Sequence, residues 1–341
     1  MINTITFQNH ISQLINKLFE SDRNAIQSPS RCFIIALSGG ADSVFLLHQL
    51  VELQKSDSCS LIVAHLNHGW RGGADQEDQQ FCQQLAEQYN VSFVTTHAED
   101  IKISKHWNGS QEELGRYQRH AFLQEVATQH NASGIFLGHQ ADDQIETFFI
   151  RLLRGASLEG LSSMREIEYP RQGIPLLRPL LNTHRTDIEQ WLSENNYSWH
   201  QDSDNEHKRF LRNRIRIDLL PMIHLIDPRF KSSFARTIKQ LQQESDLIEE
   251  FTQNTFTQIF DEAAVGNLTQ FKQLNPMLQG HLLKKLFIKN NLQFSLSASF
   301  IAEALRFLNT PQGGTHALGK TWAIQKKSQS FYLINISERP S

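Results

Sequence analysis

The sequence predicts an α/β fold with a doubly wound, mainly parallel sheet, followed by a mainly helical domain. Short apolar runs alternate with segments of helical periodicity as far as about residue 155. This alternation is typical of parallel strands joined by helices. Beyond about residue 228 the apolar residues keep a helical spacing instead. The length of 341 residues suits two domains.

The first strand is expected at 31–37, where RCFIIAL lies between Ser-Pro-Ser and Ser-Gly-Gly. Similar apolar runs predict further strands at 60–66, 91–97 and 134–138. Helical periodicity predicts helices between and after these strands, at 42–54, 75–89, 111–130 and 141–155. In such a sheet, ligands bind at the carboxyl ends of the strands.

Residues 162–182 contain Pro170, Gly173, Pro175 and Pro179, so a loop-rich connection is expected there, followed by a helix at 184–195. A long helix is expected from about 228 to 263, with further helices over 268–309. Two short strands, TWAIQ and SFYLI, are expected near the end of the chain. We place the domain boundary between residues 222 and 223.

Composition narrows the class of protein. The net charge is −3, so a polyanionic partner would need a locally basic surface. Cys32, Cys59 and Cys82 form no C-x-x-C pair, which argues against a disulfide framework, a structural zinc site and sulfur chemistry on paired thiols. No apolar run approaches the roughly 18 residues of a membrane span, and the N-terminus lacks a signal-peptide pattern. We therefore expect a cytoplasmic protein without a membrane partner.

The segment SGGADS, Ser38 to Ser43, joins the first expected strand to the first expected helix. Backbone N–H groups at a helix N-terminus bind phosphate, and glycines allow close approach. A P-loop would also carry a lysine, but none occurs between 32 and 54, so γ-phosphoryl transfer is not indicated. Asp42 could bind Mg²⁺ beside a phosphate chain. The alternative is an ordinary tight turn capped by Ser and Asp.

Two further clusters follow expected elements. The stretch HLNHGWRGGADQED at 65–78 places His65, Asn67, His68 and Arg71 just past a strand, where they could bind a phosphate or ribose. The alternative is a polar loop with a satisfied pair of histidines. The stretch EELGRYQR at 112–119 places Glu112, Arg116 and Arg119 on one helix face, where a surface ladder of ion pairs is the alternative.

The stretch GHQADDQIETFFIRLLRG at 138–155 places Asp142, Asp143 and Glu146 in the first turn of a helix, beside His139. One alternative is capping, since Asp143 and Glu146 have the spacing of a capping box. Three acids exceed what capping needs. Adjacent carboxylates at the mouth of a nucleotide site would bind Mg²⁺, a substrate amine, or both.

Taken in order, these motifs resemble the tRNA(Ile)-lysidine synthetase family within the PP-loop ATP pyrophosphatases, which have a Rossmann-like domain. The resemblance rests on SGGADS, H-x-N-H-x-x-R at 65–71, E-x-x-x-R-x-x-R at 112–119 and GHQADDQIET at 138–147. It continues through LLRG-x-x-L-x-G-L at 152–161, LLRPLL at 176–181, D-x-x-N at 202–205 and RNRIR at 212–216.

The resemblance implies a ligase reaction. ATP adenylates the C2 carbonyl oxygen of cytidine 34 in tRNA(Ile) with anticodon CAU, and pyrophosphate leaves. The side-chain amine of free L-lysine then attacks C2 and expels AMP, which leaves lysidine in the tRNA. On this reading residues 1–222 form the PP-loop catalytic domain and residues 223–341 a tRNA-binding domain. Oligomeric state stays open, with a homodimer as one option.

The resemblance also implies residue roles. ATP is expected to contact Ser38, Gly39, Gly40, Ala41, Asp42, Ser43, His65, Asn67 and His139. Catalytic roles are expected for Asp42, Asp143, Glu146, Arg116 and Arg119. The lysine ammonium is assigned to Asp143 and Glu146, and Mg²⁺ to Asp42 with Asp142 or Asp143. The tRNA is expected to contact Arg71, Arg209, Arg212, Arg214 and Arg216.

Three other readings of the motifs stay open. Another PP-loop enzyme, such as a tRNA thiolase or an amidotransferase-type ligase, would share the loop. Paired cysteines would favour the thiolase and a glutaminase domain the amidotransferase, and we find neither in the sequence. A non-catalytic nucleotide-sensing module is the third reading, against which the three acids beside an intact loop argue.

Overall fold

The computed structural model describes residues 2–21, 31–56, 59–103, 109–162, 164–170, 172–200, 211–292 and 297–336. The chain divides into two compact units, Met1–Leu241 and Gln242–Ser341. Helix α10 (Phe230–Ile259) contributes residues to both units. Each unit is treated by itself below.

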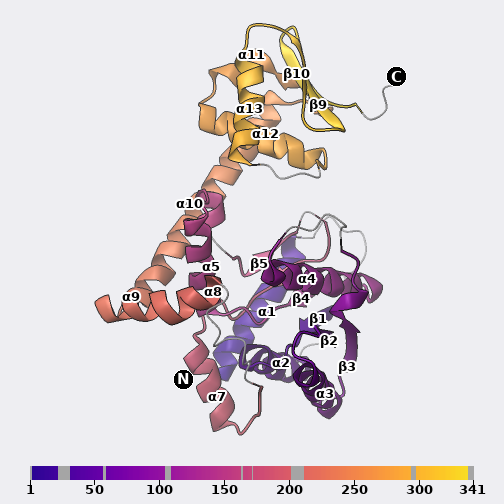
Figure 1. Ribbon diagram of the computed structural model, residues 1–341, viewed down its shortest axis with the longest axis vertical. Coiled ribbons are helices and arrows are strands. Elements are labelled where there is room, and N and C mark those ends of the chain that lie inside the picture. The colour runs from indigo at the N-terminus through magenta and orange to yellow at the C-terminus, as the bar shows by residue number, and fades with distance from the viewer. Residues whose placement is uncertain are drawn as a thin grey trace. The chain divides into compact units, whose positions relative to one another are not determined.

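The first unit is built on a six-stranded sheet (Figure 1). The strand order is β3-β2-β1-β4-β6-β5, and every neighbouring pair is parallel except β5 with β6. The strands are β1 (Cys32–Ala36), β2 (Ser60–Asn67), β3 (Ser92–His97), β4 (Gly134–Phe136), β5 (Ile167–Glu168) and β6 (Leu176–Leu177). The predicted α/β class and mainly parallel sheet are confirmed. Strands β5 and β6 were not predicted, because each has only two residues within the Pro- and Gly-containing connection.

Helices cover both faces of this sheet, as the doubly wound prediction requires (Figure 1). Along β1, Phe33 and Ile35 belong to one apolar cluster and Ile34 to another. The first cluster joins β1 to α1 (Thr4–Ser21), α2 (Ala41–Gln54), α3 (Gly73–Gln88) and α7 (Arg185–Glu194). The second joins it to α4 (Gln111–Gln129). Because β1 is buried on both faces, its sequence reads as a continuous apolar run.

Strand order reverses on either side of β1, which pairs with β2 on one edge and β4 on the other. The loops that follow β1 and β4 therefore meet at one end of the sheet. Gly138 allows them to touch, because a Cβ atom there would lie 3.1 Å from the Ser43 nitrogen and 3.2 Å from the Asp42 carbonyl carbon. Such a switch point is where open α/β sheets bind ligands.

Helix α5 (Ala141–Leu153) begins at the same end of the sheet and packs on later elements. After the short α6 (Leu158–Leu161), α7 and the segment 201–210, the chain forms α8 (Leu211–Arg214), a π-helical turn (Ile215–Leu219) and α9 (Leu220–Ile226). Ile145 of α5 packs against Phe234 and Ile238 of α10. This apolar contact ties the start of α10 to the sheet domain, so the compact unit extends past residue 222 to Leu241.

The second unit combines the end of α10 with α11 (Leu268–Gln273), α12 (Pro276–Lys289) and α13 (Ala298–Asn309). A four-stranded sheet of order β7-β10-β9-β8 packs with them. Its strands are β7 (Gly266–Asn267), β8 (Gly314–Ala317), β9 (Trp322–Lys327) and β10 (Ser330–Asn335), so TWAIQ and SFYLI fall in β9 and β10. Phe271, Phe287 and Phe331 fill its core. Among the described helices of the chain, none is long and apolar enough to cross a membrane.

Candidate active site

A cavity of about 260 Å³ opens at the carboxyl ends of β1, β2 and β4. Its apolar part includes Ala36, Leu37, Ala64, Leu66, Phe122 and Leu123. The rest of the wall is polar and comes from the loops after β1, β2 and β4, from α3 and α4, and from the chain after α7. Apolar surface beside a few convergent polar groups is typical of a small-molecule site.

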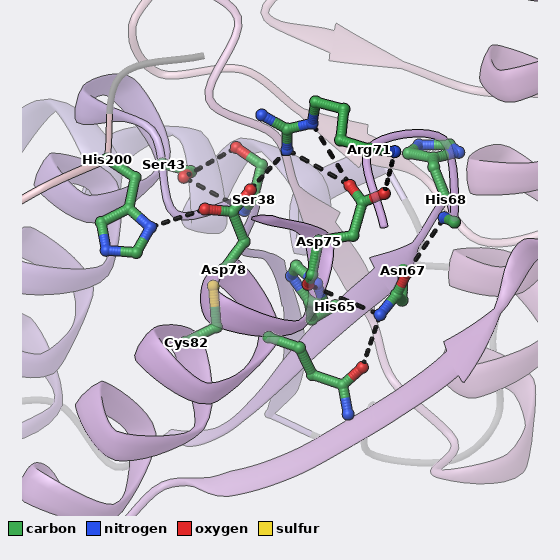
Figure 2. A network of polar contacts seen from close by, with 12 residues as sticks. Ser38, Ser43, His65, Asn67, His68, Arg71, Asp75, Asp78, Cys82 and His200 are labelled. Carbon is green, nitrogen blue, oxygen red and sulfur yellow. Dashed lines mark hydrogen bonds and ion pairs between the residues drawn. The ribbon is translucent and has the colours of Figure 1, made fainter. Parts of the chain in front are cut away.

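The loop Ser38 to Ser43 forms one side of the cavity (Figure 2). Gly39 has φ +88°, a left-handed conformation that favours glycine. The Ser38 N–H donates to Ser43 Oγ at 3.2 Å, and Ser43 Oγ donates to the Gly40 carbonyl at 2.9 Å. Ser38, Gly40, Asp42 and Ser43 line the cavity, whereas Gly39 and Ala41 belong to the loop without lining it.

Helix α2 starts at this loop without a side-chain cap. Its N-cap residue is Gly40, and no side chain accepts a hydrogen bond from the first turn. The alternative of a turn capped by Ser or Asp is therefore wrong for α2. An uncapped helix N-terminus at a cavity leaves backbone N–H groups and the positive end of the helix dipole available to an anion.

Asp42 is the carboxylate of this loop, and one of its two oxygens has no hydrogen-bond donor in the described part of the chain. Its Oδ1 atom is buried and accepts no hydrogen bond from the described residues. Burial, and then the negative charge of Asp143, raise the pKa of Asp42 from 3.8 to about 7. A buried carboxyl with a raised pKa beside a cavity is typical of a functional site.

His65 at the end of β2 and His68 in the loop after it line the cavity in their neutral forms. His65 Nδ1 lies 2.9 Å from the Leu37 carbonyl, which accepts a hydrogen bond from Nδ1–H and leaves Nε2 as an acceptor. Burial lowers the pKa of His65, and it lowers the pKa of His68 to about 4. His68 Nε2 lies 3.3 Å from Arg119 Nη2, which donates to it.

Asn67 does not line the cavity, although ATP contact was expected. Its side chain is buried and donates to Gln79 Oε1 at 3.0 Å, while its Oδ1 accepts from the Gly69 N–H at 3.0 Å (Figure 2). These bonds shape the loop after β2. The structure thus places Asn67 behind the site.

Arg71, expected to contact tRNA, is an internal ion-pair partner in the cavity wall. Its guanidinium bonds to Asp75 and Asp78 of α3 (Figure 2). Asp78 also bonds to the His200 imidazole, and the backbone N–H of His200 donates to the Gly39 carbonyl at 2.9 Å. This network connects three segments around the phosphate loop. It also turns the Gly39 carbonyl toward His200.

His139 lines the cavity from the loop after β4. Arg178 Nε donates to its Nδ1 at 3.1 Å. Arg119 of α4 lines the cavity too, and Arg116 on the same helix is exposed. Burial and then nearby arginines, among them Arg178, Arg116 and Arg119, lower the pKa of His139 well below its ordinary value. Arg178, Arg116 and Arg119 thus lie near one neutral imidazole, that of His139.

The acids of α5 lie beside the cavity and do not line it. Asp143 Oδ2 accepts from the Gln140 N–H at 3.0 Å, so the capping box is formed by Gln140 and Asp143. The alternative capping box of Asp143 with Glu146 is wrong. Asp142 forms an ion pair with Lys231 Nζ at 2.6 Å, and its other oxygen accepts from the Arg185 N–H at 3.4 Å.

Glu146 is completely buried and holds two arginines. Arg216 Nε lies 2.6 Å from Oε1 and Arg216 Nη2 lies 3.1 Å from Oε2, while Arg212 Nε lies 3.4 Å from Oε2. Burial raises the pKa of Glu146, and both guanidinium groups oppose that rise. This carboxylate therefore anchors the turn after α8 to α5.

The arginines between 209 and 216, which were expected to contact tRNA, differ in their contacts. Arg212 and Arg216 are paired inside the unit, and Arg212 also donates to Thr147 Oγ1 at 3.3 Å. Arg214 is exposed, and no described residue forms an ion pair or hydrogen bond with it. Arg209 lies outside the described residues.

Four polar residues of the site had no role in the sequence analysis, namely Asp75, Asp78, Arg178 and His200. Asp75 and Asp78 stood inside the stretch 65–78, and Arg178 inside LLRPLL. Their partners lie far away in sequence, as with His200 and Asp78, so spacing alone could not reveal these contacts.

Known proteins resemble this chain closely. Residues 4–223 match the family described as the PP-loop domain. The tRNA(Ile)-lysidine synthase of Geobacter sulfurreducens is 40% identical over 221 residues, which cover 64% of this chain and 46% of the relative. The enzyme of the same name from Synechococcus is 30% identical over 307 residues, which cover 90% of both chains. The chain thus spans about half of one relative and most of another.

A solved structure shares the fold. The U34-tRNA thiolase of Methanococcus maripaludis superposes with a TM-score of 0.52 at 18% sequence identity, covering 67% of this chain and 78% of that one. At this identity the likeness concerns the fold, and it agrees with the mainly parallel sheet.

Proposed function

We propose that this chain, which belongs to the tRNA(Ile)-lysidine synthase family of PP-loop proteins, joins L-lysine to C2 of cytidine 34 in tRNA(Ile) with anticodon CAU. ATP first adenylates the C2 carbonyl oxygen, and pyrophosphate leaves. The lysine side-chain amine then forms a bond to C2 while the bond from C2 to the adenylated oxygen breaks. AMP leaves with that oxygen, and the product base is lysidine. A tRNA substrate places the reaction in the cytoplasm.

One observation carries the proposal. A single cavity is bordered by the uncapped N-terminus of α2, by the glycine-containing loop before it, and by Asp42, one oxygen of which has no hydrogen-bond partner among the described residues. The backbone N–H groups suit the pyrophosphate part of ATP. Asp42 suits a cation that accompanies that phosphate chain. A bound cation would offset the cost of burying the unpaired Asp42 carboxylate.

Mg²⁺ is the cation that we assign to Asp42. The donor set fits, because Mg²⁺ usually takes one or two carboxylates and completes its shell with phosphate oxygens and water. Asp142 is less suited as a second ligand, because its two oxygens already contact Lys231 and the Arg185 N–H, so phosphate oxygens and water would complete the shell. Bound there, Mg²⁺ would supply positive charge to the phosphates.

The lysine ammonium needs a carboxylate that is free to hold it. Asp143 Oδ2 serves the cap, and we assign the ammonium to Oδ1, whose ion pair with Arg216 is long at 3.9 Å. Glu146 was assigned the same role from the sequence, but its two oxygens hold Arg216 and Arg212. We therefore assign Glu146 to the support of the site. A carboxylate must also take a proton from the ammonium, because only the neutral amine is nucleophilic.

For the tRNA we propose contacts with exposed arginines and with residues 223–341. Arg214 and Arg116 are exposed. Arg119 lines the cavity, so it can neutralise charge on the α-phosphate. Phosphate contacts position an RNA, and an anticodon loop offers unstacked bases that a pocket can admit. Arg71 and Arg216 are less suited to the RNA, because carboxylates already hold their guanidinium groups.

Sulfur transfer has less support. Cys82, which lies behind the phosphate loop, is fully buried, and burial raises the pKa of its thiol to about 12. Such a thiol is not a nucleophile near neutral pH. Neither Cys32 nor Cys59 forms a disulfide.

The proposal is tested by incubating the protein with ATP, Mg²⁺, labelled lysine and unmodified tRNA(Ile) bearing CAU, followed by nucleoside analysis. We expect labelled lysidine with equal amounts of AMP and pyrophosphate. A tRNA of the same body with anticodon GAU is the matched control and should take up no lysine. ADP formed in proportion to modified tRNA would contradict the assignment.

A further inference from the structure

His139 and Arg178 follow neighbouring parallel strands. Strand β4 ends at Phe136, its partner β6 ends at Leu177, and these two residues are in register. The Leu137 N–H donates to the Leu177 carbonyl at 2.9 Å, which extends the pairing by one step. Arg178 and His139 therefore emerge at the same end of the sheet. Arg178 Nε then reaches His139 Nδ1 at 3.1 Å.

This contact fixes where the imidazole carries its proton. An arginine Nε–H can only donate, so His139 Nδ1 must be the acceptor. A neutral imidazole with Nδ1 as acceptor carries its proton on Nε2. Burial and several arginines keep the pKa of His139 well below its ordinary value, so the doubly protonated form is disfavoured. His139 can thus offer one Nε2–H to the cavity that it lines.

Arg178 is held rigidly for this task. Its side chain is only 2% exposed. Nη1 lies 2.7 Å from Glu168 Oε2 and donates to the Arg165 carbonyl at 3.1 Å. A buried guanidinium is destabilising unless its donors are satisfied, and here the backbone, a carboxylate and an imidazole share them. Planar donors held on both sides of the group fix the direction of Nε–H.

We propose that Arg178 is a positioning residue that holds His139 as the Nε2–H tautomer, which donates to an oxygen of the bound nucleotide. The nucleotide part rests on the proposed function, whereas the tautomer is a property of the protein alone. A wrong tautomer would present a lone pair to a phosphate oxygen, which can only accept, and repel it. Removing the orienting partner of a metal-ligating histidine typically costs about 10- to 100-fold in affinity or activity, and we expect an effect near the lower end of that range here.

The first test reads the tautomer without any ligand. The chain has 15 histidines, so the ¹⁵N-histidine spectrum is assigned for position 139 by comparison with His139→Gln. We expect an unprotonated Nδ1 and a protonated Nε2 that do not titrate between pH 6 and 8. A protonated Nδ1 at neutral pH, or a titration in that range, overturns the proposal.

Three variants separate positioning from simple support. Glu168→Gln removes the carboxylate partner of Arg178 and leaves the bond to His139, so the spectrum of His139 should stay unchanged. Arg178→Met removes both the ion pair with Glu168 and the hydrogen bond to His139, and position 139 should then show mixed tautomers. Arg178→Lys, which keeps the charge without a planar Nε–H, should give the same mixture and serves if the Met variant does not fold. Wild-type spectra for Arg178→Lys contradict the proposal.

Kinetics extend the test to the nucleotide. Arg178→Lys should lower kcat/KM for ATP in tRNA-dependent pyrophosphate release by about tenfold. In the His139→Gln background the same change should cost less than about twofold, because glutamine carries its own N–H and has no tautomers. Equal losses in both backgrounds overturn the coupling. Absence of lysine transfer by a protein with the expected tautomer would instead count against the proposed reaction alone.

Discussion

The N-termini of α2 and α5 look alike in sequence and differ in the structure. Both helices follow a parallel strand at the same end of the sheet, and both carry acids in their first turns. Asp42 at α2 keeps a buried oxygen without a hydrogen bond. At α5, Asp143 caps the helix and Glu146 holds two arginines. We infer that the unpaired Asp42 takes part in the reaction, whereas the paired Glu146 supports the site.

This difference arises from partners distant in sequence. The three acids of α5 exceed the needs of capping, as the sequence suggested, but the excess is matched by Lys231, Arg212 and Arg216. The structure therefore accounts for two of the acids by ion pairs formed within the unit. What looked like one cluster for the substrate amine separates into a helix cap, ion pairs of Asp142 and Glu146, and one Asp143 oxygen with a long contact of 3.9 Å to Arg216.

Glu146→Gln should give the largest change, in stability. It leaves Arg216 and Arg212 without their shared carboxylate in a buried place, which typically costs about 3–5 kcal/mol. Urea denaturation monitored by circular dichroism measures the loss. Glu112→Gln is the control, because its half-exposed carboxylate lies 3.7 Å from Arg212 and should contribute under about 1 kcal/mol. A Glu146 variant as stable as the control would remove the supporting role.

Asp42→Asn should act in the opposite sense on stability. The folded-state pKa of about 7 exceeds the ordinary 3.8, so the folded protein keeps a proton that the unfolded chain releases. Stability from the neutral acid is complete below pH 3.8 and is lost as the pH rises through 7. That difference corresponds to about 4 kcal/mol. The variant of the ligand-free protein should therefore gain stability at pH 8 and little at pH 4.

The same substitution should lower the rate of lysine transfer by about a thousandfold, since it removes the charge that we assign to the cation beside the phosphates. Thermal unfolding at the two pH values and a single-turnover assay measure both effects. A stability gain that is equal at pH 4 and pH 8 would show that the carboxyl group does not titrate near 7.

The sequence predicted the fold and the position of the candidate site better than it predicted the roles of the residues in that site. Alternating apolar runs predicted β1 to β4, and the loop 38–43 was recognised because its residues are contiguous. Strands β5 and β6 were not predicted, because a strand of two residues is too short to show an alternating pattern. Asn67 and Arg71 were expected to contact ATP and tRNA. In the structure the Asn67 amide donates to Gln79 and the Arg71 guanidinium donates to Asp75. Polar pairing across the fold decides such roles, and spacing does not encode it.

Asp143→Asn tests the remaining acid of α5 with a smaller effect. Asparagine can still accept from the Gln140 N–H, so the cap and the fold should persist. Loss of the charge should lower the rate of lysine transfer roughly a hundredfold, equal to about 3 kcal/mol. Steady-state assays at saturating ATP and varied lysine measure it. Turnover near that of the wild type would leave Asp143 only its capping role.

The smallest effect separates Arg214 from Arg216. Arg214 is exposed, whereas Arg216 bonds to Glu146 through two nitrogens. Arg214→Ala should weaken tRNA binding and reduce its dependence on log salt concentration by about one unit of slope, because one phosphate contact is lost. ATP binding should not change. Filter binding over a salt series measures the slope.

Lys55→Ala is the matched control for this measurement. It removes one exposed positive charge at the C-terminal end of α2, away from the phosphate loop that begins the helix. Its salt titration should overlay that of the wild type. Arg216→Ala should instead lower stability, since it leaves Glu146 buried with only Arg212 beside it. If Arg214→Ala also overlays the wild type, the RNA does not cross the exposed side of α8, and its phosphates must be met by other cations.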